Sequence, residues 1–269
     1  MIDIENYAAF LRKTNKSENT VTSYLYAARQ FTTLYGEVTK QNLRLYKTYL
    51  VENFKPKTVN IRLLALNGYA VSIGKPELKL RLVRIQQKPF LENVISNEDY
   101  IYFKRKLNNP AERYWYFVIR FLAATGARIS ELLQIKVEHV QVGYYDIYTK
   151  GGKIRRIYIP KTLRTETEKW LQTLNRTSGY LFLNRFGERI TTRGISQQLK
   201  NYAVKYGLNE KVVYPHSFRH RYAKNFLEKF NDIALLADLM GHESIETTRI
   251  YLRRSSLEQQ EIVDKVITW

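Results

Sequence analysis

The chain has 269 residues, of which 44% are apolar, and its 44 Lys and Arg against 25 Asp and Glu give a formal net charge of +19. It has no cysteine, which excludes disulfides and thiol chemistry, and no apolar run is long enough to span a membrane. The first residues lack the apolar core of a secretory signal, so we expect a cytoplasmic protein. The basic excess covers both the first 90 residues and the remainder, which favours a nucleic acid partner. Composition alone leaves RNA, other polyanions and anionic lipid open.

The N-terminal part has the apolar spacing of four short helices. The inward positions are, in chain order, Ile4, Tyr7, Ala8 and Leu11, then Val21, Leu25, Ala28 and Thr32, then Leu43, Tyr46 and Leu50, and then Val59, Leu63, Leu66, Ala70 and Ile73. Gly36 ends the second predicted helix, Thr39 is a suitable N-cap for the third, and Pro56 fits the first turn of the fourth. Four such helices form a small bundle. The basic segment 75–89 is interrupted by prolines, which indicates a linker.

A second domain begins at Ser96, which is spaced from Asp99 as in a capping box. Helical spacing predicts helices over 96–107, 113–125, 161–175, 193–206, 217–229, 232–240 and 245–252, and a last amphipathic segment over 257–267. The period changes to two over 144–149 and 154–160, which predicts a β-hairpin with glycines in its turn. The expected fold is mainly α, with a four-helix domain over 1–88 and a larger α+β domain over 92–269 that contains a small hairpin sheet.

Two basic segments of the second domain are candidates for phosphate chemistry. Arg128 follows a helix that ends at a glycine and could direct its guanidinium at a phosphate. Taken alone, a surface ion pair with Glu131 is the simpler interpretation. A lysine in the hairpin turn, Lys150 or Lys153, could donate a proton, although a solvated turn explains both lysines equally well.

A histidine and an arginine lie three residues apart, at His216 and Arg219, and share one face of a predicted helix. Together they suit a phosphoryl site. His216 and His220 could instead bind a metal at i and i+4, but the His-Glu-x-x-His pattern and a third ligand are lacking. A basic surface helix is an equally good interpretation of this segment alone.

The segment 239–251 joins a histidine to a tyrosine. Gly241 ends one predicted helix, His242 lies at the junction, and Ser244 can cap a short helix that carries Tyr251. Because the chain has 21 tyrosines, Tyr251 by itself indicates only a structural residue.

The order of these segments is more specific than any one of them. An arginine shortly after a glycine, a hairpin lysine, His-x-x-Arg, Gly-His and a tyrosine nine residues later follow one another from Thr125 to Tyr251. This order resembles the tyrosine site-specific recombinase family, which includes phage integrases, Xer recombinases and transposon-borne relatives. The N-terminal helices resemble the core-binding domain of that family.

The resemblance implies a role for each matched residue. Tyr251 is expected to form a 3′-phosphotyrosyl bond with DNA, and Arg128 and Arg219 are expected to stabilise the transition state. It further implies that Lys150, with Lys153 as competitor, is the general acid and that His216 is the base. His242 is expected to donate to the phosphate, and Glu131 is the acid expected to brace the site. The chemistry is expected to need no cofactor, no metal and no ATP.

The resemblance also implies partners. We expect double-stranded DNA with paired recognition sites and a homo-tetramer on that DNA. The helix 257–267 is expected to dock on a neighbouring protomer through Leu257, Val263, Val266 and Ile267. Packing of this helix on its own domain is equally compatible with the sequence. Integration, excision and resolution of DNA elements remain open. The alternatives are a type IB topoisomerase and a catalytically silent DNA-binding protein, for which the intact set of site residues would be superfluous.

Overall fold

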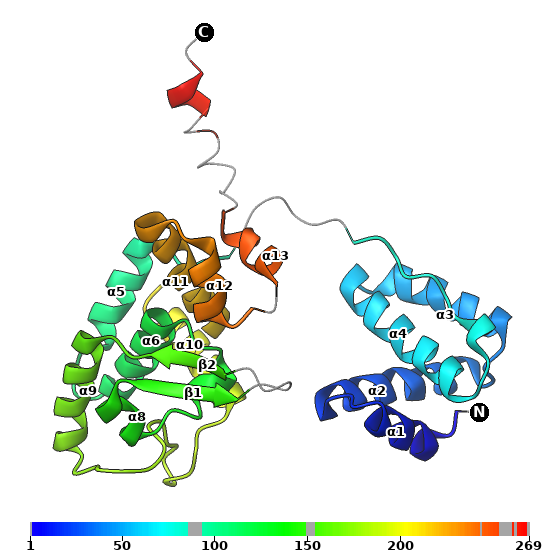
Figure 1. Cartoon of the computed structure of the whole chain (residues 1–269), viewed down its shortest axis with the longest axis horizontal. Helices are drawn as coiled ribbons and strands as arrows, with labels where there is room; N and C mark the ends of the chain where they lie inside the picture. Colours follow the sequence, from blue (N-terminus) through cyan, green and yellow to red (C-terminus); the bar gives the residue numbers. More distant parts are fainter. Residues whose placement is uncertain are drawn as a thin grey trace. The chain divides into compact units, whose positions relative to one another are not determined.

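The computed structural model describes residues 2–85, 93–148, 154–242, 244–252, 260 and 263–267. The chain divides into two compact units, Met1–Gln87 and Lys88–Trp269 (Figure 1). Both units are helical, and the sheet in the described ranges has two strands, so the expectation of a mainly α fold with a small hairpin is confirmed. Within these ranges, no helix is both long enough and apolar enough to cross a membrane.

The first unit contains the four predicted helices. They are α1 (Ile4–Lys13), α2 (Glu18–Tyr35), α3 (Lys40–Asn53) and α4 (Pro56–Ser72). The side chains of Asp3, Ser17 and Thr39 cap the first three by accepting backbone N–H groups, as short polar side chains do at helix starts. The prediction that Ile73 points inward is wrong, because α4 ends one residue earlier and leaves Ile73 40% exposed.

The segment after α4 is not a free linker over its whole length, which corrects the prediction for 75–89. It starts with a 3-10 turn, η1 (Pro76–Leu78). The Asn67 side chain then both accepts from the backbone N–H of Leu80 and donates to its carbonyl oxygen, at 2.8 and 2.9 Å. Asn60, two turns earlier on α4, holds Val83 in the same way. Paired amide bonds of this kind satisfy both backbone groups and fix the segment against the bundle.

The second unit is built around a long apolar helix. Its elements are α5 (Asn97–Leu107), α6 (Arg113–Thr125), α7 (Ile129–Leu132), α8 (Val137–Val142), β1 (Tyr144–Tyr148), β2 (Ile154–Tyr158), α9 (Lys161–Thr173), α10 (Thr192–Lys205), α11 (Pro215–Phe230), α12 (Ile233–Met240), α13 (Ile245–Thr248) and η2 (Arg249–Leu252). Helix α6 packs against α5, α9 and α11 and forms the centre of the core. Helix α8 was not predicted, because six residues are too few to display a period.

The hairpin strands β1 and β2 pair antiparallel, with Asp146 opposite Arg156. Alternate residues of β2 point inward, so Ile157 and Arg155 are buried while their neighbours are exposed. Burial is ordinary for isoleucine, whereas an arginine is almost never buried unless it has partners. The predicted turn, with Lys150 and Lys153, lies outside the described residues.

The end of the second unit differs in detail from the prediction. The helix expected over 245–252 consists of α13 and a 3-10 turn, η2, which carries Tyr251. Both α12 and η2 contact α11, and α13 contacts α12 and η2 (Figure 1). Much of 257–267, including Leu257, lies outside the described residues; residues 263–266 are helical, and Val263, Val266 and Ile267 are exposed.

Candidate active site

The junction between α6 and α7 positions Arg128. Gly126 ends α6 with φ +62, and a Cβ there would lie 2.5 Å from the ring of Tyr222, so conformation and space both favour glycine. Arg128 is the N-cap of α7, and its backbone N–H and guanidinium donate to the two carboxylate oxygens of Glu131 at 2.7 and 2.8 Å. Its other terminal nitrogen donates to the Gly241 carbonyl at 3.2 Å. The side chain stays 38% exposed. Arg128 can therefore pair with Glu131 and still contact a phosphate.

A second arginine, which the sequence did not single out as a site residue, binds the same carboxylate. Arg155 on β2 donates to Glu131 Oε1 at 2.6 Å and to the Leu239 carbonyl at 3.0 Å, and its side chain is 5% exposed. A Cβ on Gly241 would lie 2.2 Å from Arg155 Cδ, so the turn after α12 requires glycine. Burial raises the pKa of Glu131, but Arg155 and the hydrogen bonds from Arg128 outweigh it and lower that pKa overall. Glu131 therefore remains a carboxylate that holds both arginines.

Arg219 on α11 is the third arginine of this cluster. It is 3% exposed and donates to the carbonyl oxygens of Gly126 and Met240 and to Nε2 of His242, the last at 3.1 Å. It also lies 4.0 Å from Glu131 Oε2. Burial, together with the charges of the two other arginines, lowers its pKa to about 10, so it stays protonated at neutral pH. Three guanidinium groups around one carboxylate leave an excess of positive charge that a phosphate can balance.

His242 lies between Arg219 and η2. A guanidinium can only donate, so Nε2 of His242 accepts from Arg219, and Nδ1 carries the ring proton and donates to Thr248 Oγ1 at 2.8 Å. Burial and the charges of Arg219, Arg128 and Arg155 lower the pKa of His242 to about 4. The imidazole is therefore neutral at neutral pH.

Tyr251 is 6% exposed and packs in a small apolar cluster with Ala223, Leu227, Leu236 and Met240. Its ring lies nearly parallel to that of His242, with centroids 6.3 Å apart. Its hydroxyl lies 3.1 Å from Nδ1 of His220. Burial raises the pKa of Tyr251, and Arg219 opposes that rise through its charge and a hydrogen bond.

The structure thus brings together five residues named from the sequence, Arg128, Glu131, Arg219, His242 and Tyr251. His216 lies exposed on α11, one turn before His220, with ring centroids 6.3 Å apart. The sequence analysis considered His220 only as a metal ligand and missed its contact with the tyrosine. Its position next to Arg219 and one turn after His216 was the available signal.

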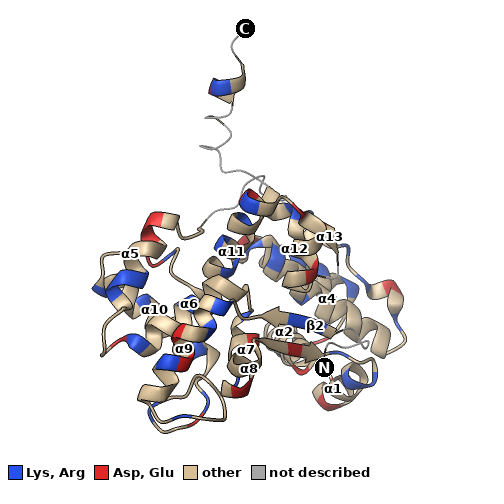
Figure 2. Cartoon of the chain, turned by 60° about the vertical axis from the view of Figure 1, so that its left-hand side comes forward, with Lys and Arg blue, Asp and Glu red and all other residues tan. Residues whose placement is uncertain are grey.

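Basic side chains are spread over both units (Figure 2), and a cavity lies apart from the arginine cluster. Lys and Arg occur along the helices of both units (Figure 2).

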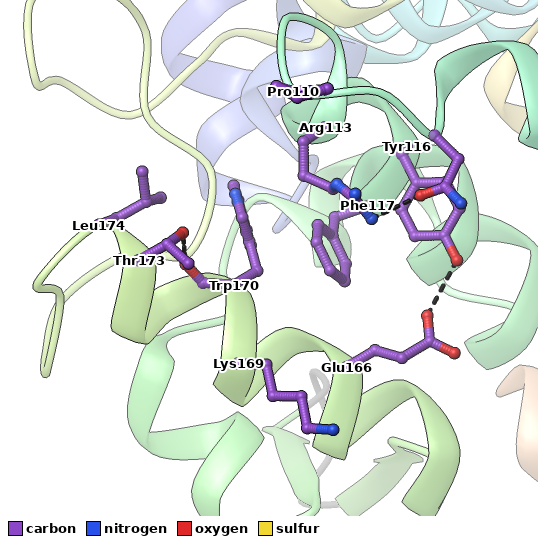
Figure 3. A pocket seen from close by; sticks show the side chains of 10 residues that line it. Pro110, Arg113, Tyr116, Phe117, Glu166, Lys169, Trp170, Thr173 and Leu174 are labelled. Carbon is purple, nitrogen blue, oxygen red and sulfur yellow. Dashed lines mark hydrogen bonds between the residues drawn. The ribbon is translucent and has the colours of Figure 1, made fainter.

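A cavity of about 740 Å³ lies between α6 and α9, where the Tyr116 hydroxyl contacts Glu166 at 2.9 Å (Figure 3). Its lining consists of Asn108, Pro110, Arg113, Tyr116, Phe117, Glu166, Lys169, Trp170, Thr173 and Leu174. It shares no residue with the arginine cluster.

Comparison with known proteins identifies the family of the chain. The chain is 28% identical to tyrosine recombinase XerA of Pyrococcus furiosus, over 97% of this chain and 93% of the relative. It is also 28% identical to tyrosine recombinase XerD of Listeria innocua, over 97% and 80%. The fold matches that of the Tn1549 transposon integrase in complex with transposon right end DNA, with a TM-score of 0.72, 16% identity and 99% of each chain covered. Residues 95–258 match the phage integrase family. The chain belongs to the phage integrase family.

Proposed function

We infer that this protein is a site-specific tyrosine recombinase that cleaves and rejoins double-stranded DNA through a covalent 3′-phosphotyrosyl bond at Tyr251. One observation carries the assignment of the chemistry: the Tyr251 phenol lies beside His242 and Arg219, and both arginines of the matched motif gather at Glu131. These residues come from α7, α11, the turn after α12 and η2, so packing rather than local sequence assembles the set. The proposed substrate is double-stranded DNA.

The arginines supply the electrostatic part of the reaction. Arg128 and Arg219 stabilise the non-bridging oxygens of the pentavalent transition state, and loss of one such donor costs about 3 kcal/mol of transition-state stabilisation. Their positions are held by Glu131 and by the carbonyl oxygens of Gly126, Met240 and Gly241. Donors that are already aligned do not have to reorganise as charge develops.

The histidines manage protons around the phosphate. From the family motif, His216 is the candidate base toward Tyr251, although the Tyr251 hydroxyl contacts His220 rather than His216. We propose His242 as a donor to the scissile phosphate. In the structure, Nε2 of His242 accepts from Arg219. An anionic phosphate beside Arg219 favours a proton on that nitrogen, because opposite charge raises a histidine pKa. With that proton, His242 can donate to the phosphate.

Lys150 is proposed as the general acid that protonates the leaving 5′-oxygen. Lys150→Ala is expected to lose about 10² to 10⁴-fold in cleavage of normal DNA. A substrate with 5′-bridging sulfur needs no proton for its leaving group, so it should restore the rate. Lys153→Ala serves as the matched control and is expected to lose little on either substrate. Sulfur rescue of Lys153→Ala but not of Lys150→Ala would reverse the assignment.

We propose that the protein acts as a homo-tetramer on paired recognition sites. We also propose that the protein and its DNA are in the cytoplasm. Val263, Val266 and Ile267 are exposed in the described part of the tail, which supports docking of that helix on a neighbouring protomer. Val266→Asp should leave cleavage of a single site intact and abolish exchange between two sites. Lys265→Ala, in the same helical turn, is the control that should retain exchange.

The central test is covalent trapping on a nicked suicide substrate. Wild-type protein should form an adduct, and Tyr251→Phe should lose at least about a thousandfold while it still binds DNA. Tyr222→Phe removes the hydroxyl of a half-buried tyrosine of the same unit and should still form the adduct. An adduct from Tyr251→Phe would move the nucleophile elsewhere. Strand exchange between two duplexes, rather than relaxation of supercoils, separates a recombinase from a type IB topoisomerase.

A further inference from the structure

Helix α11 carries Arg219 and His220 next to each other, and the two side chains contact different groups. Arg219 is directed to the arginine cluster and to His242. His220 is directed to the nucleophile, with Nδ1 3.1 Å from the Tyr251 hydroxyl and ring centroids 5.5 Å apart. None of the roles derived so far uses this contact.

The direction of the contact follows from the hydrogen-bonding capacity of each partner. The phenolic hydroxyl of Tyr251 has one hydrogen to donate, and a neutral imidazole has one ring nitrogen that accepts. Nδ1 of His220 is at hydrogen-bond distance and, with the ring proton on Nε2, presents a lone pair.

The packing keeps this acceptor in place. The tyrosine ring is buried against α11 and α12 by Ala223, Leu227, Leu236 and Met240, so its hydroxyl has little freedom to turn away. His220 is half-buried, and burial, His216 and Arg219 lower its pKa to about 4, which keeps the ring neutral and able to accept.

We propose that His220 is the residue that takes the phenolic proton when Tyr251 attacks DNA. The proposal rests on the proposed function, in which Tyr251 is the nucleophile. As the bond from the phenolic oxygen to phosphorus forms, the O–H pair stays on that oxygen and the proton passes to Nδ1. The bond from phosphorus to the 5′-oxygen breaks, and that oxygen keeps the bonding pair and receives a proton from the general acid. On rejoining, the imidazolium returns its proton to the tyrosine.

The experiment compares cleavage rates on suicide DNA between about pH 6 and pH 10 for three forms of the full chain. His220→Asn keeps an oxygen acceptor where Nδ1 was but cannot hold the proton, and His220→Phe keeps the ring shape without an acceptor. Both are expected to lose about 10² to 10³-fold near neutral pH. The deficit should then shrink as pH rises, because hydroxide deprotonates the phenol in place of the histidine.

A full rate in His220→Asn would reduce the contact to simple positioning and overturn the proposal. A deficit that is the same at every pH would also overturn it, because a structural defect does not respond to hydroxide. DNA affinity and the unfolding temperature of both variants are measured beside the rates, so that misfolded protein is not scored.

His216→Asn tests the competing candidate base, which lies on the preceding turn of α11. The titratable or charged groups that face His220 are His216, Arg219 and Tyr251, while Arg128 and Tyr214 act on Tyr251. A deficit that shrinks with pH only in His216→Asn would assign the proton to His216 instead. If Tyr251→Phe still forms an adduct, the proposed function fails; if it forms none while the His220 variants cleave normally, the His220 assignment alone fails.

Discussion

The two units differ in what they bury. Among the described residues, the buried side chains of the first unit are aliphatic or aromatic, as in the cluster around Phe31 and Leu50. All buried charged, Ser and Thr side chains belong to the second unit: Glu112, Thr125, Arg155, Thr167, Ser217, Arg219 and Thr248. Three of these, Arg155, Arg219 and Thr248, surround the candidate active site.

The difference shows where function constrains folding. Removing a charged group from water costs several kcal/mol, and an apolar core of the same size is often more stable. Among its described residues the first unit buries no charged side chain, so it has no such cost to offset. The second unit has to hold cationic donors in fixed positions, and Glu131 with the surrounding carbonyl oxygens offsets the cost of their burial.

The largest expected effect concerns how much each unit contributes to DNA affinity. If both basic units contact phosphates, the affinity of the whole chain should fall by about 10³-fold or more between 50 and 200 mM salt. The fragment 92–269 should bind far more weakly and show a shallower slope, because it releases fewer counterions. Equal affinities and slopes in a binding titration would show that the second unit holds DNA alone.

A pair of core substitutions tests the difference in buried chemistry. Glu131→Ala leaves Arg128 and Arg155 without their carboxylate and should cost about 3 to 5 kcal/mol of stability, with loss of cleavage. Leu50→Ala in the first unit should cost about 2 to 5 kcal/mol through a cavity, with the cleavage step unchanged on saturating DNA. Urea unfolding and single-turnover cleavage are measured together. Loss of the cleavage step in Leu50→Ala would argue against independent roles.

The histidines give a smaller effect that is confined to the second unit, since all four lie there. The pKa of His242 and of His220 is lowered to about 4 in the folded chain, against about 6.5 when unfolded. Their contribution to stability is thus present above about pH 6.5 and is lost as pH falls toward about 4. NMR titration should show midpoints well below 6.5 for both rings, and DNA should raise that of His242. Midpoints near 6.5 would contradict the described environment.

The smallest expected effect concerns the segment after α4. Asn67→Ala removes both hydrogen bonds to Leu80 and should cost about 1 to 3 kcal/mol, because two backbone groups lose their partners. Asn53→Ala removes an exposed hydrogen bond to Tyr49 and should change stability by less than about 0.5 kcal/mol. Amide hydrogen exchange at Leu80 should accelerate only in Asn67→Ala.

Local patterns in the sequence were sufficient for most elements and for the motif residues. Apolar spacing and caps such as Ser17 and Thr39 predict helices because the period and the end groups are local properties. The order from Arg128 to Tyr251 indicated a shared site because it resembles the motif order of the tyrosine recombinase family. Their individual roles stay predictions, and those of Lys150 and Lys153 rest on sequence alone.

Tertiary structure alone decided which other side chains join that site. Nothing local distinguishes Arg155 from Arg156 in the sequence; the inward alternation of β2 and its pairing with β1 bury one and expose the other. His220 contacts Tyr251 only because η2 packs on α11, 31 residues away along the chain. Asn67 fixes Leu80 because α4 ends where the chain can turn back along it. Such contacts depend on distances between elements, and these are set by how the whole core packs.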